Sequence, residues 1–365
     1  MVRDQEPAPQ PLPDRGRTLQ KTRRKVFNLV SALLFISLLS VHGSNHAVAE
    51  GPASYEGFGA TTRGGSGAAI VRVTNLNDSG PGSLRDAVSK GNRTIVFDVG
   101  GEIVLRSAIR VMGAFITIDG FTAPSPGTTL KGAGLSLHGK RGAHDIIVRG
   151  LRIRDSKATA STDGITIAYG AYNIIVDHVS IEGSIDENID ISEGSHDVTV
   201  SWSILARPAG TEKNLLIKYN PSRVTLHHNI FTKARQRNPQ VRIDDAGTPA
   251  TDTTLDMRNN IVWDWGAGYG TLVWYGPRAN IVNNYYSSSN NAIRVTSARA
   301  YVQGNFSADQ REINEVGNET SPFPAPSVDT QEACPAARLV LEKAGVRPLD
   351  SVDRDFVSGI TIPSC

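Results

Sequence analysis

The chain has 365 residues, with 38 Lys and Arg, 36 Asp and Glu, and only two cysteines. Residues 1–49 hold seven of these cations and three of these anions, so the remainder of the chain carries a net charge of −2. A chain with this charge balance has no overall positive electrostatic potential that would bind a polyanion, which argues against non-specific binding of nucleic acid. An acidic ligand would have to be bound by a local group of cations.

The first 49 residues have the three-part pattern of a signal peptide. Residues 1–24 are polar and basic, residues 26–41 form an apolar run, and Ala47-Val48-Ala49 supplies a small-x-small cleavage site. The run is short for a membrane span, which favours this interpretation over an uncleaved anchor. Arg23 and Arg24 resemble the twin-arginine export motif, although an ordinary basic region fits nearly as well. We expect a secreted, extracellular protein without a membrane segment after cleavage.

Residues 50–365 predict a single elongated domain with both ends covered. Solenoids exceed the usual domain size because each coil contacts only its neighbours. Ser83, with Asp86 three residues later, predicts the N-cap of a short helix that covers the first coil. Residues 306–365 predict a C-terminal strap, with a short helix over residues 335–345. Cys334 and Cys365 both lie in this tail, and the sequence leaves open whether they pair.

Short β-branched segments recur through the middle of the chain. They start at Asp145, Asn173, Asp197, Arg223 and Thr254, which are 28, 24, 26 and 31 residues apart. This period predicts an all-β parallel β-helix, in which each coil buries its inward residues against adjacent coils. An antiparallel sandwich is the competing interpretation, but hairpin signals at spacings of about eight to twelve residues are scarce.

Four asparagines follow successive strands in the same register. Asn229, Asn260, Asn284 and Asn305 are 31, 24 and 21 residues apart. Their amides could stack as a ladder inside a turn, where asparagine also tolerates left-handed backbone conformations. We interpret these residues as structural.

Charged residues gather between residues 163 and 242. Three carboxylates are followed by three cations: Asp163, Asp186, Asp190, Lys213, Arg237 and Arg242. Equivalent positions of successive coils lie about 4.8 Å apart, so these groups can share one face of a β-helix. Clustered carboxylates indicate a calcium site, and arginines in a fork geometry indicate capture of substrate carboxylates. The stretch therefore predicts a site for an acidic substrate.

Several motifs, in order, resemble the pectate lyases of polysaccharide lyase family 1. They are Asp163-Gly-Ile-Thr-Ile, Val176-Asp-His-Val-Ser, Asp186-Glu-Asn-Ile-Asp-Ile, Val198-Thr-Val-Ser-Trp-Ser, Lys213-Asn-Leu-Leu-Ile, Val224-Thr-Leu-His-His-Asn and Arg237-Asn-Pro-Gln-Val-Arg. The resemblance covers residues 71–305 and implies a right-handed parallel β-helix. It also implies endolytic β-elimination of α-1,4-linked polygalacturonate (pectate) by a monomeric enzyme.

The resemblance also implies residue roles. Asp163, Asp186 and Asp190 take the positions of Ca2+ ligands. Lys213 takes the position of the lysine that binds the substrate carboxylate, Arg237 that of the Brønsted base, and Arg242 that of the second substrate-binding arginine.

Those residue types suit an elimination. Removing the C5 proton, α to a carboxylate, develops enolate-like charge that Ca2+ and Lys213 would stabilise. An arginine side chain has a pKa near or above 12.5, so less than about 10⁻⁴ of it is neutral at pH 8. Nearby cations lower such a pKa, and we therefore expect a rate that rises into the alkaline range.

The chain departs from the family pattern at two positions. Ser161 stands where some members carry another acidic ligand, and Lys218 stands where glycine is common. The first difference could weaken metal binding, and the second could alter a subsite.

Two other function classes stay open. A galacturonan hydrolase would need paired carboxylates, for which Asp244 and Asp245 are the adjacent candidates on the cationic face. A non-catalytic polysaccharide-binding β-helix would lack Lys213 or Arg237, and both are present. Pectin lyase is the nearest enzymatic relative, but it would not keep the calcium aspartates. We interpret Asp177 and His178 as a buried hydrogen-bonded pair.

Overall fold

The computed structural model describes residues 54–158, 162–210, 212–243, 249–266, 268–288, 291–309, 312–363 and 365. The predicted signal peptide, Ser161, Asp244 and Asp245 lie outside these residues. Pro52–Cys365 form one compact unit. No helix among the described residues is both long enough and apolar enough to cross a membrane.

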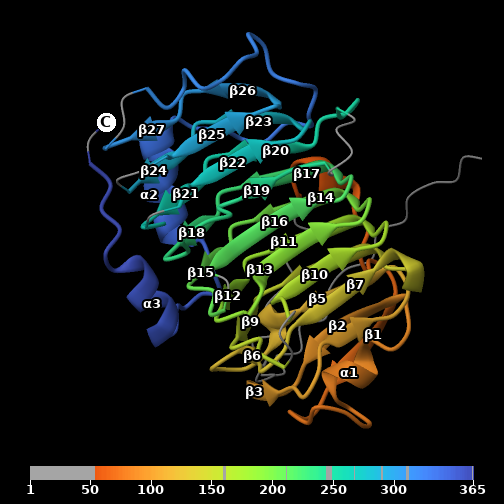
Figure 1. Cartoon of the computed structure of the whole chain (residues 1–365). Coiled ribbons are helices and arrows are strands. Elements are labelled where there is room, and N and C mark those ends of the chain that lie inside the picture. Colours follow the sequence, from red (N-terminus) through yellow and green to blue (C-terminus); the bar gives the residue numbers. More distant parts are fainter. Residues whose placement is uncertain are drawn as a thin grey trace, which may run out of the picture. The chain divides into compact units, whose positions relative to one another are not determined.

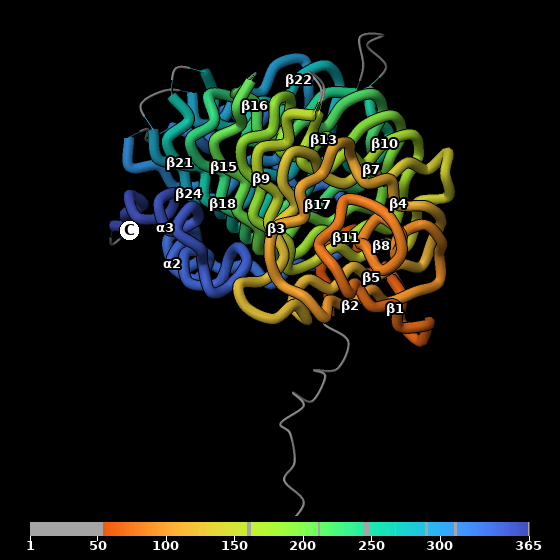
Figure 2. Tube along the Cα trace, turned by 90° about the horizontal axis from the view of Figure 1, so that it is seen from below, coloured from red at the N-terminus to blue at the C-terminus, as the bar shows by residue number. Residues whose placement is uncertain are grey.

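The described strands form three sheets, and every strand pair is parallel (Figure 1). Each sheet takes about one strand from each coil, as the trace in Figure 2 shows. The predicted parallel β-helix is thereby confirmed, and the antiparallel sandwich is excluded.

The first sheet has ten strands. They are β1 (Ala69–Val73), β2 (Arg93–Phe97), β5 (Ile116–Asp119), β8 (His144–Arg149), β11 (Tyr172–Asp177), β14 (His196–Ser201), β17 (Ser222–His227), β20 (Leu255–Arg258), β23 (Arg278–Val282) and β26 (Arg299–Gln303).

The second sheet has nine strands. They are β3 (Gly101–Val104), β6 (Thr128–Lys131), β9 (Leu151–Arg154), β12 (Ser180–Glu182), β15 (Ile204–Ala206), β18 (Ile230–Thr232), β21 (Ile261–Trp263), β24 (Tyr285–Ser287) and β27 (Phe306–Ser307).

The third sheet, called the site sheet below, has eight strands. They are β4 (Ile109–Val111), β7 (Leu135–His138), β10 (Ile165–Ala168), β13 (Glu187–Ser192), β16 (Lys213–Lys218), β19 (Gln240–Val241), β22 (Thr271–Trp274) and β25 (Ile293–Thr296).

Inward aliphatic side chains stack in register along the first sheet. Ile146, Ile174, Val198, Val224 and Leu255 occupy equivalent positions of five successive coils and are fully buried. Burying one such side chain contributes about 1.5–3 kcal/mol to folding, so the core fixes the register of every coil. The segment starts predicted from the sequence fall at the same position in each of these coils.

The starts of four of the five predicted repeats adopt a left-handed backbone conformation. Asp145, Asn173, Asp197 and Arg223 have φ values of 51°, 52°, 55° and 53°. Asp and Asn tolerate this region better than most residues, which explains their recurrence at the turn.

The predicted asparagine ladder is confirmed. Asn229 donates a side-chain hydrogen bond to Asn260, Asn260 to Asn284, and Asn284 to Asn305, each at 2.9 Å. A second ladder, which the sequence analysis missed, joins Asn188, Asn214 and Asn238 at 2.8 and 3.0 Å beneath the site sheet. These side chains satisfy buried polar groups at the turns between sheets.

Both predicted terminal helices are present. Helix α1 (Leu84–Ala87) begins after Ser83, whose hydroxyl accepts a hydrogen bond from the Asp86 backbone N–H at 3.2 Å. Helix α2 (Ala333–Lys343) begins two residues earlier than predicted, and the sequence analysis missed helix α3 (Ser351–Val357). The Asp350 side chain caps α3 by accepting from the Asp353 N–H at 2.8 Å.

The C-terminal segment is fixed against the second sheet (Figures 1 and 2). Phe356 of α3 belongs to a buried apolar cluster with Ile204, Ile230 and Ile261 of successive strands. Arg154 also forms an ion pair with buried Asp353 at 2.8 Å. Cys334 and Cys365 form a disulfide, which settles the pairing that the sequence left open.

We expect Asn260→Ala to lower the free energy of unfolding by about 2–4 kcal/mol, because it removes several hydrogen bonds and leaves buried partners unsatisfied. Asn260 accepts from the Asn229 N–H and donates to Asn284 and to the Leu226 carbonyl. Urea denaturation would measure the change. Asn77→Ala, at an exposed position, is the matched control and should change the free energy by less than about 0.5 kcal/mol. Equal effects of both substitutions would contradict the ladder's role.

Candidate active site

The predicted site residues lie on, or directly beside, four adjacent strands of the site sheet. Strands β10, β13, β16 and β19 follow one another in its order. In β13, Ile189 and Ile191 point into the core and are fully buried, whereas Asp190 between them lies on the opposite face. Strict alternation would place Glu187 on the same side as Ile189, but its carboxylate lies beside Asp163 and Asp186 and pairs with Arg237, so the alternation begins only after Glu187.

Three carboxylates meet at the start of strands β10 and β13. Asp163, Asp186 and Glu187 each offer one oxygen, and these oxygens lie within 4.8 Å of one another. Asp163 is held in place because its carboxylate accepts hydrogen bonds from the Thr166 hydroxyl at 2.7 Å and from the Glu187 backbone N–H at 3.1 Å. Among the described residues this is the one group of three or more potential metal ligands this close together.

Asp190 lies farther along β13 and is not one of these three carboxylates. It pairs in register with Thr166 of β10, and its charge raises the pKa of Asp163. Asp190 is therefore close to the cluster without sharing its centre. Its assignment as a calcium ligand stays a prediction.

Burial raises the pKa of three carboxylates in this region, those of Asp163, Glu187 and Asp190. The pKa of Asp163 rises to about 7, chiefly through burial and then through Asp190, and that of Asp190 rises to about 6, chiefly through burial. Burial also raises the pKa of Glu187, although Arg237 opposes this shift. The site therefore concentrates negative charge that a divalent cation would stabilise.

The predicted cations adjoin the carboxylates. Lys213, the first residue of β16, lies 3.8 Å from Asp186 and pairs in register with Glu187. Arg237 has a left-handed backbone, with φ of 62°, and forms an ion pair with Glu187. Each of these two contacts places one positive charge beside the carboxylate cluster.

Arg242 follows β19 and rests against aromatic rings. Its guanidinium carbon lies 4.8 Å from the ring centroid of Trp274 and 5.1 Å from that of Tyr275. Such cation–π contacts hold a guanidinium in a defined place while it stays able to bind a carboxylate.

Glu187 was not predicted as a site residue from the sequence. Its place directly after Asp186 was a signal, but two-residue alternation from the inward Ile189 assigns Glu187 to the core side. In the structure it pairs in register with Lys213. Glu187 contacts both the carboxylate cluster and the predicted base.

Asp177 and His178 lie away from the site sheet. The His178 ring lies 2.8 Å from Asp177 of β11, as a partly buried hydrogen-bonded pair in the first sheet. Trp265 is fully buried, whereas Trp274, the last residue of β22 in the site sheet, lies beside Arg242.

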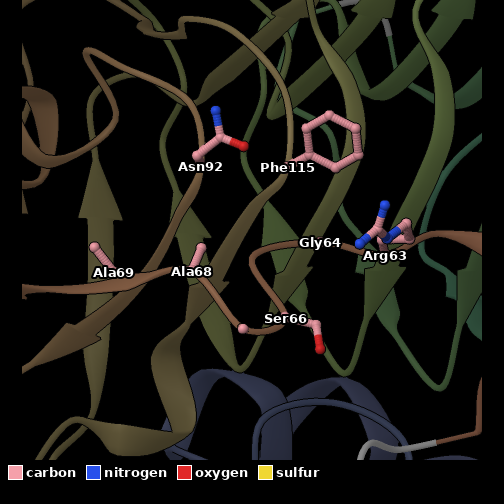
Figure 3. A pocket seen from close by; sticks show the side chains of 8 residues that line it. Arg63, Gly64, Ser66, Ala68, Ala69, Asn92 and Phe115 are labelled. Carbon is pink, nitrogen blue, oxygen red and sulfur yellow. The ribbon is translucent and has the colours of Figure 1, made fainter.

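A separate hollow of about 340 Å³ lies near the first coils, in front of strands of the first sheet (Figure 3). Arg63, Ser66, Asn92 and Phe115 are among its lining residues, and the Arg63 guanidinium lies 5.5 Å from the Phe115 ring centroid. None of the predicted site residues lines it, so it is distinct from the carboxylate cluster.

The carboxylate cluster fits a calcium ion. Calcium binds six to eight oxygen ligands, with aspartate and glutamate carboxylates among the common ones. Burial raises the pKa of Asp163 to about 7 and that of Asp190 to about 6, and a bound cation would offset the cost of holding these carboxylates charged. Fixed carboxylates beside fixed cations can bind an anionic substrate together with a metal.

Comparison with known proteins adds an independent finding. No model of a known protein family matches the chain. The chain is 34% identical to a probable pectate lyase C of Emericella nidulans over 84% of its own length and 72% of that protein. It is 38% identical to a probable pectate lyase C of Aspergillus terreus, covering 74% of this chain and 62% of that protein.

Solved structures show the same fold. A pectate lyase of Bacillus sp. N165 in complex with trigalacturonate aligns with a TM-score of 0.63 at 21% identity, over 81% of this chain and 99% of that one. Jun a 1, the major cedar pollen allergen, aligns with a TM-score of 0.59 at 21% identity, over 80% of this chain and 92% of that one.

The fold and these relatives define a parallel β-helix polysaccharide lyase. Within that class, the chain belongs to the pectate lyase family.

We expect the chelated protein to lose thermal stability as pH rises from about 4 to about 7. The pKa of Asp163 is raised from 3.8 to about 7 in the folded state, so the stability it contributes is present below about pH 4 and lost above about pH 7. Calcium at roughly 100 times its Kd should add about 2.7 kcal/mol to the free energy of unfolding.

Because protons compete with the metal, this gain should be larger at about pH 8 than at about pH 5. Calorimetric Tm values with calcium or chelator at both pH values would measure it. An equal calcium effect at both would contradict the assignment of these carboxylates.

Proposed function

We propose that this chain is a calcium-dependent pectate lyase that cleaves polygalacturonate by β-elimination, with Arg237 as the base. The proposal rests on how five residues are arranged on one face of four adjacent strands. They are Asp163, Asp186, Lys213, Arg237 and Arg242. It offers metal ligands and three cations to an acidic polysaccharide.

In the proposed reaction, Arg237 takes the C5 proton of a galacturonate residue. The C–H electron pair forms the C4–C5 double bond, and the bond from C4 to the glycosidic oxygen breaks. That oxygen leaves with its electron pair and is then protonated. Lys213 holds the carboxylate of the reacting residue, where its charge stabilises the developing enolate-like anion, and Arg242 binds a substrate carboxylate.

Calcium, when bound, would supply further positive charge at the substrate carboxylate. Asp163, Asp186 and Asp190 would hold it, as the sequence predicts, together with Glu187. Glu187 also forms an ion pair with Arg237, so it joins the carboxylates to the proposed base.

The hydrolase alternative rests on Asp244 and Asp245, which lie outside the described residues. The cationic face supports the lyase better, because hydrolysis depends on two separated carboxylates rather than on cations.

We also propose that the protein is exported and acts outside the cell as a monomer, with residues 50–365 as its single catalytic domain. The Cys334–Cys365 disulfide supports this proposal, because disulfides persist in oxidising compartments. Mass spectrometry of the secreted protein should give a mature chain that starts at Glu50. A mature chain that kept residues 26–41 would contradict signal cleavage.

Incubation with polygalacturonate and calcium should produce ultraviolet absorbance from the unsaturated product, and excess chelator should abolish it. The rate should rise into the alkaline range. Release of reducing ends without absorbance would move the protein to the hydrolase class. Absorbance that persists in chelator would contradict the calcium assignment.

We expect Arg237→Lys to lower kcat by about 10²–10⁴, because it removes a positioned base and its fork geometry. Calcium should still raise the Tm of this variant, since the carboxylates remain. Arg235→Lys is the matched control, two residues away with a side chain that is 60% exposed, and its kcat should stay within about twofold of the original. A kcat of Arg237→Lys within tenfold of the original would overturn the assignment of the base.

A further inference from the structure

Two cations stand side by side on the outward face of the site sheet. Ile217 of β16 pairs in register with Val241 of β19, which places the following residues, Lys218 and Arg242, next to each other. The Arg242 backbone N–H also donates to the Ile217 carbonyl at 2.9 Å. Adjacent strands lie about 4.8 Å apart, so both side chains leave the sheet from neighbouring points.

Lys218 is half-buried and contacts an aromatic ring. Its ammonium lies 3.9 Å from the Tyr219 ring centroid and donates a hydrogen bond to the Tyr219 hydroxyl. Among the described residues, no carboxylate oxygen lies within 4.0 Å of this ammonium. The neighbour in register on the other side is the neutral Ser192, and the next acidic residue along that strand, Glu193, is exposed.

Like charges on directly opposed positions of a sheet destabilise it. A carboxylate placed between Lys218 and Arg242 can accept charge-assisted hydrogen bonds from both cations. Two tyrosines stand on the same edge, because Tyr219 directly follows Lys218, and Tyr275 packs against Arg242. Both are 41% exposed, so they can contact a ligand.

The pair is distinct from the catalytic position. Lys213 and Lys218 are the first and last residues of β16, so their backbones lie roughly 16 Å apart by strand rise. Lys218 is therefore placed at the opposite end of the strand from the carboxylate that Lys213 holds at the reacting residue. It can reach a different uronate of the same chain.

We propose that Lys218 is a further substrate-binding residue, which together with Arg242 and the Tyr219 and Tyr275 rings binds a second, unesterified galacturonate carboxylate. This proposal rests on the proposed pectate lyase function. Methyl esterification removes the charge that the two cations recognise, so the pair makes the enzyme favour de-esterified substrate.

We expect Lys218→Met to raise KM for polygalacturonate about tenfold, which corresponds to about 1.4 kcal/mol, with kcat within about twofold. For highly methyl-esterified pectin, KM should change by less than about twofold. The ratio of kcat/KM for polygalacturonate to kcat/KM for highly methyl-esterified pectin should therefore fall about fivefold or more. Lys218→Arg keeps the charge and should keep KM within about threefold of the original.

Lys140→Met is the matched control. The Lys140 ammonium lies 4.4 Å from the ring centroid of Tyr169, which is 40% exposed. This is the same lysine–tyrosine contact at the edge of β10, three strands from β19. Its KM values should match those of the original enzyme.

The outcomes separate this inference from the proposed function. If the original enzyme gives calcium-dependent product while Lys218→Met keeps KM for polygalacturonate within twofold, with an unchanged Tm, the inference is wrong and the proposed function stands. An equal rise in KM for both substrates would also overturn it, because charge recognition would then not be the cause. If the original enzyme forms no unsaturated product, the proposed function fails and the inference falls with it.

Discussion

The parallel register of the coils is the constraint on which the rest of the structure depends. Ile146, Ile174, Val198 and Val224 stack in line because each inward side chain is buried only by its counterparts above and below. A one-residue slip would turn this row to the solvent. The same alternation presents Asp190 outward between buried isoleucines, so packing of the core positions the site.

The site holds opposed charges in a partly buried place. Burial raises the pKa of Asp163 to about 7, while Lys213 and Arg237 supply positive charge to Asp186 and Glu187. Under the proposed function, a bound calcium ion would offset the cost of burying these carboxylates. Glu187 links the two halves of the site, since it contacts both the carboxylate cluster and the predicted base.

Much of this could be predicted from the sequence, because a solenoid repeats one local pattern. The repeat starts from Asp145 onward, the Asn229 ladder and the cap at Ser83 all depend on short-range rules. Glu187 and the Asn188 ladder were missed because their roles depend on which strand lies beside them. Helix α3 was missed because its buried Asp353 is paired with Arg154, almost 200 residues away in the chain. The neighbours of Lys218 likewise become visible only once the strand register is known.

A crystal structure of the Arg237→Lys variant, grown with calcium and trigalacturonate, would test the central claim most directly. The account predicts a calcium ion about 2.3–2.6 Å from carboxylate oxygens of Asp163 and Asp186, with a galacturonate carboxylate bound to Lys213. Trigalacturonate bound on the site sheet without a metal at these carboxylates, or calcium bound elsewhere, would contradict it.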